Sequence, residues 1–199
     1  MIKNKKWATL FSHTGSEIVN ISKHLDRFPD RIITNNIPGG SINKELDKCS
    51  ITYTERNPSV ETYRDLFEDA DIITLHGWMR IIPKQICREY KIYNLHPGLI
   101  TEYPELKGAD PQKRVAECND GRYKHIGCVI HKVIPEVDEG EILLEKSIRN
   151  DFHGEKEISC RLHEMALLLW LELLQPKYNK PLNENNKRRN HHNSNGQSQ

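Results

Sequence analysis

Short apolar runs alternate with segments of helical spacing along most of the chain. Such alternation is typical of βαβ units, in which helices cover a parallel sheet. The expected strands are Ala8–Ser12, Arg31–Thr34, Ser50–Tyr53, Asp71–His76 and Ile92–Leu95. The expected helices are Ser16–Leu25, Ile42–Asp47, Val60–Glu68, Pro83–Glu89 and Pro111–Glu117, with Ser59 as an N-cap and Pro83 as a first helical residue.

The pattern changes near residue 126. Ile126–Val133 and Glu141–Ile148 are strand-like and are joined by the short polar turn IPEVDEG, so an antiparallel pair is expected. Glu155–Leu174 carries apolar residues every three or four positions, which predicts a helix packed on the sheet. These patterns predict an α/β fold with a mostly parallel sheet and an antiparallel C-terminal addition.

Length and composition favour one globular domain, because 199 residues suffice for a single core. We assign residues 1–175 to this domain and expect residues 176–199, which are almost without apolar side chains, to be disordered. Lys187-Arg188-Arg189 in this tail could touch a polyanion, but a solvated tail is the simpler interpretation. The balance of 29 Lys+Arg against 28 Asp+Glu leaves no overall field to recruit nucleic acid or an anionic membrane.

Three features indicate the cellular compartment: cysteine usage, the N-terminal segment and the length of the longest apolar run. The five cysteines form no CxxC pair, and their odd number does not suggest a disulfide framework. The start MIKNKKWATLF lacks the apolar core of a signal peptide. The longest nearly apolar run, Met165 to Leu174, is about half a membrane span and contains Glu172. A reduced, cytoplasmic protein is therefore expected.

Three polar segments follow expected strands: SHTGSE the first, LHGWMRIIP the fourth and NLHPGL the fifth. Ligands of open α/β sheets bind beyond the carboxyl ends of the strands, so these segments are expected to meet. Asn94 and His96 are two residues apart and point to one side of their strand. They would offer a neutral donor and a group that titrates near pH 7, although an ordinary turn Asn and strand-end His are the alternative.

Two loops are further candidates. Asp138, in the turn HKVIPEVDEG, could reach back and hold His96 in one orientation, whereas a merely solvated acidic turn is the alternative. In the first loop, backbone N–H groups near Gly15 could cradle an anion. Glu17 would repel phosphate there, however, and Ser16 could simply be an N-cap.

Several other site classes find no support in the sequence. There is neither HExxH nor CxxC, so no metal is expected, and there is no Walker lysine loop and no G-x-S-x-G elbow. The first turn is HTGS rather than GxGxxG, and Asn35 and Asn36 stand where a dinucleotide-binding fold needs an acid. These features argue against a dinucleotide-dependent oxidoreductase.

Taken together, LHGWMRII, NLHPGLI, GCVIHKVIPEVDEGEIL and the closing amphipathic helix resemble, in this order, the folate-dependent formyltransferases. The resemblance runs from Trp7 to Leu174, and its layout is closest to the single-domain phosphoribosylglycinamide (GAR) formyltransferases. Its core is N-x-H-P followed by H-x₆-D-x-G, and this core is specific because the spacing and the sheet position both fit. The resemblance implies a single Rossmann-like formyltransferase domain.

The resemblance also implies a chemistry of one-carbon transfer in purine biosynthesis, in which an amine attacks the formyl carbon of 10-formyltetrahydrofolate. Asn94 and His96 would stabilise the oxygen that becomes charged, and Asp138 would orient His96 and help relay protons. The donor-binding positions that it implies are Arg80, Ile81, Ile82, Val133, Ile134, Pro135, Glu136 and Val137. The acceptor-binding positions are Thr14, Gly15, Ser16, Met79 and His131. The partners implied are folate and a small amine, for a monomer or homodimer.

Departures from the family pattern fall on the acceptor side. His13 and Glu17 stand in a loop that is glycine-rich and ends in Asn in the family, and Ala166-Leu167 replaces a Glu-His pair. Thr101 stands where the family has Pro. GAR is the first candidate acceptor, but another amine stays open. Hydrolysis of the donor is an alternative, because KGADP resembles a deformylase loop; a sugar-nucleotide N-formyltransferase and an inactive folate-binding module are others.

Overall fold

The computed structural model describes residues 2–118, 120–152 and 154–175. The prediction of a disordered tail over residues 176–199, with its Lys187-Arg188-Arg189 run, lies outside the described residues. In the described ranges, no helix is both long enough and apolar enough to cross a bilayer.

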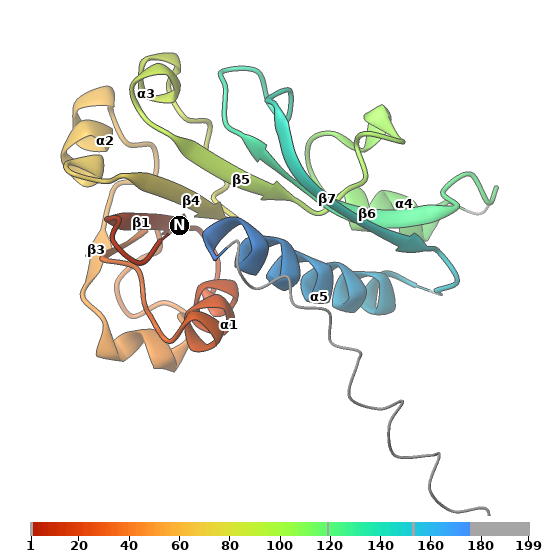
Figure 1. The fold of residues 1–199 in the computed structure, drawn as a ribbon, viewed down its shortest axis with the longest axis horizontal. Helices are drawn as coiled ribbons and strands as arrows, with labels where there is room; N and C mark the ends of the chain where they lie inside the picture. Colours follow the sequence, from red (N-terminus) through yellow and green to blue (C-terminus); the bar gives the residue numbers. More distant parts are fainter. Residues whose placement is uncertain (1, 119, 153, 176–199) are drawn as a thin grey trace, which may run out of the picture.

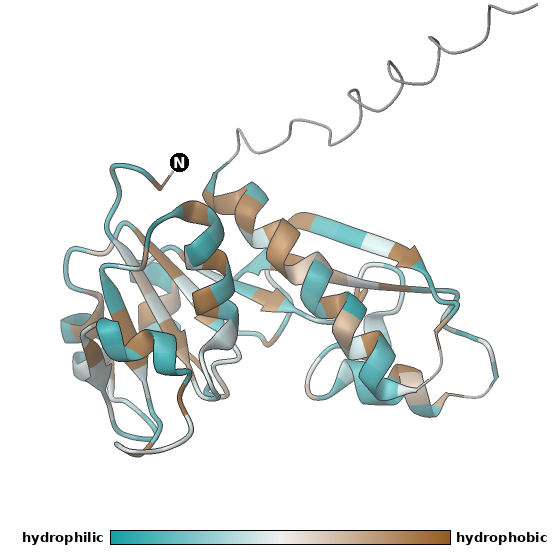
Figure 2. Cartoon of the chain, turned by 90° about the horizontal axis from the view of Figure 1, so that it is seen from below, coloured by the Kyte–Doolittle hydropathy of each residue, from teal (hydrophilic) through white to brown (hydrophobic). Residues whose placement is uncertain are grey.

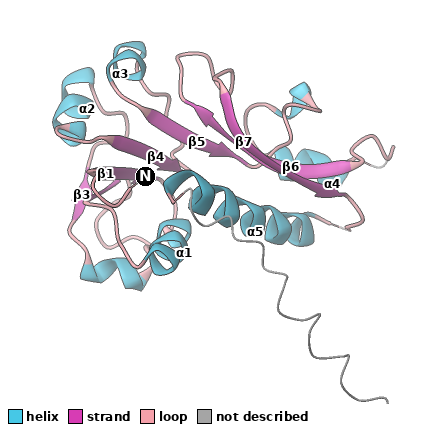
Figure 3. Ribbon diagram, viewed as in Figure 1, coloured by secondary structure: helices cyan, strands magenta, loops and turns pink. Residues whose placement is uncertain are grey.

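The strands form one sheet across the middle of the molecule (Figures 1 and 3). They are β1 Trp7–Phe11, β2 Arg31–Thr34, β3 Ile51–Tyr53, β4 Ile72–His76, β5 Ile92–His96, β6 His125–Lys132 and β7 Ile142–Arg149. The order in the sheet is β3-β2-β1-β4-β5-β6-β7. β1 to β5 run parallel, whereas β6 is antiparallel to β5 and to β7. The prediction of a mostly parallel sheet with an antiparallel C-terminal addition is confirmed.

Helices cover both faces of the parallel part of the sheet, with α1 and α5 on one face and α2 and α3 on the other (Figure 1). Their bounds are α1 Ser16–Leu25, α2 Val60–Phe67, α3 Lys84–Glu89, α4 Pro111–Glu117 and α5 Glu155–Leu174. Two short 3₁₀ segments, η1 Lys44–Lys48 and η2 Pro104–Leu106, lie in loops. The expectation of an α-helix over Ile42–Asp47 is therefore wrong in type, because the Asn43 side chain caps a tighter turn there.

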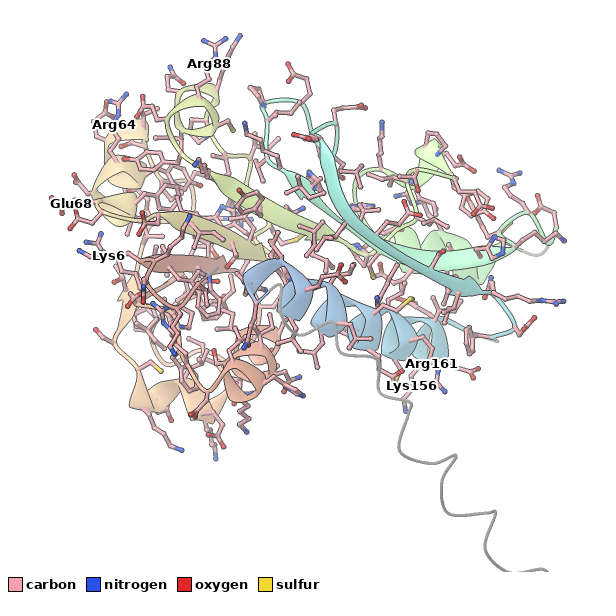
Figure 4. The ribbon with its side chains drawn as sticks, in the orientation of Figure 1. Lys6, Arg64, Glu68, Arg88, Lys156 and Arg161 are labelled. Atoms are coloured by element: carbon pink, nitrogen blue, oxygen red, sulfur yellow. The ribbon has the colours of Figure 1, made fainter. Side chains whose placement is uncertain are left out.

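Amphipathic spacing explains how α5 packs. Ile158, Leu162, Met165 and Leu169 recur at helical spacing and are buried against the sheet. Lys156 and Arg161 of the same helix point away from the sheet (Figure 4). Figure 2 shows this change from apolar to polar residues around the helix. On the other face, α2 is capped by Ser59 as predicted, and Arg64 ties α2 to Glu89 of α3 at 2.6 Å.

The register of the central strands decides which side chains share a face. Leu75 of β4 pairs with Asn94 of β5, and Leu75 belongs to the apolar cluster that α2 and α3 cover. Because side chains alternate along a strand, Asn94 and His96 lie on this same face. His76 then points to the opposite face, where its ring packs on Trp170 of α5. The topology thus separates two histidines that end neighbouring strands.

Candidate active site at the carboxyl ends of β4 and β5

A cavity of about 440 Å³ opens where β4 and β5 end. Its walls come from the loops after these two strands, from residues 108–112 and from the turn between β6 and β7. Every position expected to bind the formyl donor lines it, namely Arg80, Ile81, Ile82, Val133, Ile134, Pro135, Glu136 and Val137. Asn94, His96 and Asp138 line the same cavity, as do Met79 and His131.

The antiparallel pairing of β5 and β6 brings two of these side chains together. Asn94 and His131 are directly opposite in the register, and Asn94 Nδ2 lies 3.2 Å from His131 Nε2. His131 Nδ1 donates to the Lys132 carbonyl at 3.1 Å, which orients the ring. A strand pair, rather than a flexible loop, therefore holds the amide and this imidazole.

Asp138 lies between two buried histidines. Its Oδ2 is 3.2 Å from His96 Nδ1, and its Oδ1 is 3.3 Å from His131 Nε2. The Gly108 N–H donates to Oδ2 at 2.9 Å. Burial alone would raise the pKa of the Asp138 carboxyl, but the hydrogen bonds from His131 and His96 outweigh it and hold this pKa well below its usual range. Asp138 is therefore a carboxylate at neutral pH.

The turn geometry that presents Asp138 depends on two special residues. The backbone of Asp138 is left-handed, with φ of 55°, a conformation that Asp adopts more easily than most residues. Gly140 follows, and a Cβ there would lie 1.7 Å from the Lys132 carbonyl oxygen. A larger residue would push the turn off β6 and move Asp138 with it.

The ring of His96 is held at both nitrogens. Nδ1 faces Asp138, and Nε2 lies 2.9 Å from the Leu106 carbonyl oxygen. Because a carboxylate and a carbonyl only accept, a ring that donates from both nitrogens satisfies this arrangement. Gly98 allows the ring to sit close, since a Cβ there would lie 2.8 Å from His96 Nε2.

Comparison with known proteins identifies the family of the chain. The sequence matches the formyl transferase family over residues 12–167. The chain belongs to this family. Over 118 residues it is 36% identical to a phosphoribosylglycinamide formyltransferase of Dictyostelium discoideum, covering 54% of this chain and 56% of that protein.

Solved structures of a formyltransferase and of a deformylase share the fold. A phosphoribosylglycinamide formyltransferase from Anaplasma phagocytophilum is similar with a TM-score of 0.71 at 22% identity, over 83% of each chain. A formyltetrahydrofolate deformylase from Pseudomonas syringae is similar with a TM-score of 0.65 at 19% identity, over 85% of this chain and 61% of that one. These likenesses show the fold alone. The chain spans about half the length, 56%, of the Dictyostelium relative.

The first loop of this formyl transferase lies apart from the cluster around Asp138. Thr14, Gly15 and Ser16 do not line the cavity, although His13 does. The alternative that Ser16 is an N-cap is wrong, because Gly15 occupies that position with φ of 72°. Thr14 Oγ1 contacts Ser16 Oγ at 2.9 Å, and Ser16 Oγ also accepts from Asn43 at 3.1 Å, so these polar groups are engaged within the loops.

Glu17 has a partner that sequence reasoning missed. Its Oε2 lies 2.6 Å from His76 Nδ1, and the His76 side chain is buried. The carboxyl group that we expect to repel a phosphate is thus shared with a titratable ring. No sequence signal links the two residues, which are 59 positions apart.

Other contributors to the site escaped the sequence patterns as well. Trp78 lines the cavity, and so do Ala109 and Gln112 in the loop that precedes and begins α4. The Leu106 carbonyl and the Gly108 N–H act through the main chain, which carries no residue-type signal. The similarity of KGADP to a deformylase loop was the one indication that this loop belongs to the site.

The walls of the cavity suit a flat donor that carries both apolar and hydrogen-bonding groups. Three apolar side chains at its rim are exposed: Ile81 by 70%, Val137 by 54% and Met79 by 52%. Apolar surface is therefore available there to contact a ligand. Gln112 Oε1 is buried and has no hydrogen-bond partner within the described part of the chain. Such an acceptor fits a ligand that brings N–H groups, as a pterin does.

Proposed function

We propose that this chain is a formyltransferase that moves the formyl group of 10-formyltetrahydrofolate to the amine of a small acceptor. The observation that carries this proposal is the meeting of Asn94, His96 and Asp138 in one cavity, with the carboxylate 3.2 Å from the imidazole. A neutral amide and an imidazole that converge on one cavity can stabilise a carbonyl oxygen as it gains negative charge.

In this reaction the donor supplies the formyl group, and the protein supplies orientation and charge. Asn94 offers amide hydrogens and His96 offers its Nε2 hydrogen to the oxygen that becomes charged. In the structure the Leu106 carbonyl accepts from Nε2, so a substrate oxygen competes with this carbonyl. Asp138 orients His96 and stabilises positive charge on its ring. Loss of one donor of this kind typically costs about 2.7–4 kcal/mol of barrier.

The donor is assigned to the wall that Arg80 to Ile82 and Val133 to Val137 form. Three residues of the rim are exposed and apolar, and transfer of such surface from water stabilises a bound ligand by about 25 cal/mol per Å². The acceptor is assigned to the side of His13 and Met79, which adjoins the first loop. There the Ser12 hydroxyl accepts from the Met79 N–H at 3.0 Å and joins the two loops.

GAR is the first acceptor to test, because the Dictyostelium relative is named for it. Hydrolysis of the donor is the second candidate, since water needs no acceptor site and the chain shares its fold with a deformylase. An amino-sugar nucleotide is the third. An inactive folate-binding module would bind the donor without turnover.

One assay separates these functions. The full chain is incubated with 10-formyltetrahydrofolate alone, and then with GAR or with amino-sugar nucleotides, while tetrahydrofolate and formate are measured. Acceptor-dependent release of tetrahydrofolate without formate supports transfer, whereas formate release that ignores the acceptor supports hydrolysis. Donor binding with no turnover under any condition would overturn the proposal of an enzyme.

A further inference from the structure

A half-buried arginine outside the cavity lining holds the loop that contacts His96. The Arg114 guanidinium of α4 donates to three consecutive carbonyls, those of Glu105, Leu106 and Lys107. Nη2 lies 2.8 Å from the Leu106 oxygen and 2.9 Å from the Lys107 oxygen. No carboxylate pairs with Arg114 among the ion pairs of the described residues, so main-chain carbonyls are its partners. A planar, rigid fork is suited to fixing successive carbonyls in this way.

The same short segment reaches both members of the proposed catalytic pair. The Leu106 carbonyl accepts from His96 Nε2 at 2.9 Å, and the Gly108 N–H donates to Asp138 Oδ2 at 2.9 Å. The Leu106 oxygen has two lone pairs, and Arg114 and His96 engage one each. The Leu106 oxygen thus links the Arg114 guanidinium to the His96 imidazole through two hydrogen bonds.

A second tie fixes the far side of the segment. Lys107 Nζ lies 2.7 Å from Glu139 Oε1, next to Asp138 in the turn between β6 and β7. This pair is partly exposed, with side chains 31% and 51% accessible, and pairs of this kind stabilise weakly. The three hydrogen bonds that the half-buried Arg114 donates are therefore the stronger restraint on residues 105–108.

We propose that Arg114 is a positioning residue for formyl transfer. By fixing residues 105–108, it places the Leu106 carbonyl on His96 and the Gly108 N–H on Asp138, so that the imidazole and carboxylate keep one relative orientation. The inference rests on the proposed function of Asn94, His96 and Asp138. It differs from a purely structural role, in which loss of Arg114 would lower stability and leave the geometry of His96 unchanged.

The test uses the full-length chain with Arg114→Gln, which keeps much of the length but loses the charge and the fork. Arg114→Lys keeps the charge and loses the fork, and it carries the test if the Gln variant does not fold. Lys113→Gln on the same helix is the matched control, because Lys113 is exposed and contacts only Glu117 among the ion pairs described. The measurements are kcat, the KM for donor and acceptor, the melting temperature, and the side-chain ¹H–¹⁵N signal of His96 Nε2.

Both Arg114 variants are expected to lower kcat about 10- to 100-fold, because small displacements of catalytic groups have effects of this size. The KM for the donor stays within about twofold of the control, since the donor wall is untouched. The His96 Nε2–H signal, assigned by its absence in His96→Asn, is expected to shift and to exchange faster with solvent.

Control-like kcat and an unchanged His96 signal in a folded Arg114 variant would overturn the inference. Failure of the proposed function can be distinguished from failure of the inference about Arg114. If the wild type transfers formyl to none of the amines tested, the function falls, but the His96 signal still decides whether Arg114 positions the ring. If His96→Asn abolishes transfer while Arg114→Lys does not impair it, only the inference falls.

Discussion

Two histidines end neighbouring strands, and each has a carboxyl group at its Nδ1. His96 of β5 lies 3.2 Å from Asp138, and His76 of β4 lies 2.6 Å from Glu17. Both rings are buried, with residue exposures of 4% and 5%. The two pairs use the same chemical groups, and they differ in what surrounds them.

The pair at His76 is closed off by other side chains. The Thr74 hydroxyl donates its one hydrogen to Thr9 and accepts from the Trp7 indole at 2.8 Å. The contact of 2.9 Å between Thr74 Oγ1 and His76 Nε2 is then a bond that the histidine donates. The Trp170 ring covers His76 at 4.6 Å between centroids. Both ring nitrogens have partners in the protein: Nε2 bonds to Thr74 in the core, and Nδ1 faces Glu17, whose side chain is 24% exposed.

The pair at His96 faces a cavity, and its outer partner is a loop carbonyl. A loop can yield to a ligand more easily than a packed strand. The contrast indicates that a buried histidine–carboxylate pair is a candidate for catalysis only where one partner can be exchanged for substrate. At His76 we expect the same pair to serve the stability of the fold.

The largest effect is expected from a substitution that breaks the pair at His96. His96→Ala removes the proposed donor to the charged oxygen, so kcat is expected to fall by about 10²- to 10³-fold. Tetrahydrofolate release at saturating donor measures it. His125→Ala, an exposed histidine that contacts Glu102, is the control and keeps wild-type turnover. Equal turnover in the two variants contradicts the assignment of His96.

The pair at His76 is expected to respond in the opposite way. His76→Ala leaves Glu17 without its partner and removes the ring that packs on Trp170, so the free energy of unfolding falls by about 2–3 kcal/mol. Urea denaturation measures this loss, with His24→Ala on the surface of α1 as control. kcat per folded molecule stays within a few-fold of the wild type. A loss of kcat as large as that of His96→Ala would remove the distinction between the pairs.

The pH dependence of stability sharpens the contrast further. Because the folded pKa of Asp138 lies below the ordinary value of 3.8 for this carboxyl, the carboxylate stabilises the fold above that pH. The contribution declines as pH falls through 3.8 toward the lower folded value. Melting temperatures between about pH 5 and pH 2 are expected to fall less steeply in Asp138→Asn than in the wild type.

Asp120 provides the comparison for that experiment. Hydrogen bonds from the Cys118 thiol and the Arg122 N–H lower the pKa of this exposed carboxyl to about 2. Solvent screens such a surface pair, so Asp120→Asn is expected to leave the slope nearly as in the wild type. A slope in Asp138→Asn equal to that of Asp120→Asn contradicts a buried, functional carboxylate.

The smallest expected effect concerns the rim of the cavity. Ile81→Ser removes apolar surface from a side chain that is 70% exposed, so folding is little affected. The KM for the formyl donor is expected to rise about fivefold, as loss of roughly 1 kcal/mol of apolar contact predicts. Ile37→Ser is the matched control, because Ile37 is 81% exposed and does not line the cavity. An equal KM in both variants removes Ile81 from the donor wall.

Much of the fold could be predicted, because each element carries its own periodic pattern. α1, β2 and α5 have the bounds that apolar spacing indicated, and Ser59 caps α2 as its hydroxyl suggests. The segment over residues 42–47 was mistaken for an α-helix, since its few apolar residues suit a 3₁₀ turn equally well. Likewise, Pro83 caps α3 instead of beginning it.

The candidate site was predictable where residues share a strand or a motif. Asn94 and His96 are two positions apart, and Asp138 follows His131 at a spacing that resembles the formyltransferases. The pairing of Glu17 with His76 was not predictable, because a contact across 59 positions leaves no local pattern. The role of Leu106 could not be predicted for another reason. Its main-chain carbonyl contacts His96 Nε2, and every residue has such a carbonyl whatever its side chain.

By itself the sequence determined the order of strands and helices along the chain, the family, and the residue types available at the ends of β4 and β5. These depend on local periodicity and short motifs, which neighbouring residues encode. Only the tertiary structure decided which histidine faces the cavity, which one is closed into the core, and which loop carbonyl Arg114 holds against His96. Those outcomes depend on strand register and on packing between distant segments, since one step along a strand moves a side chain to the other face of the sheet.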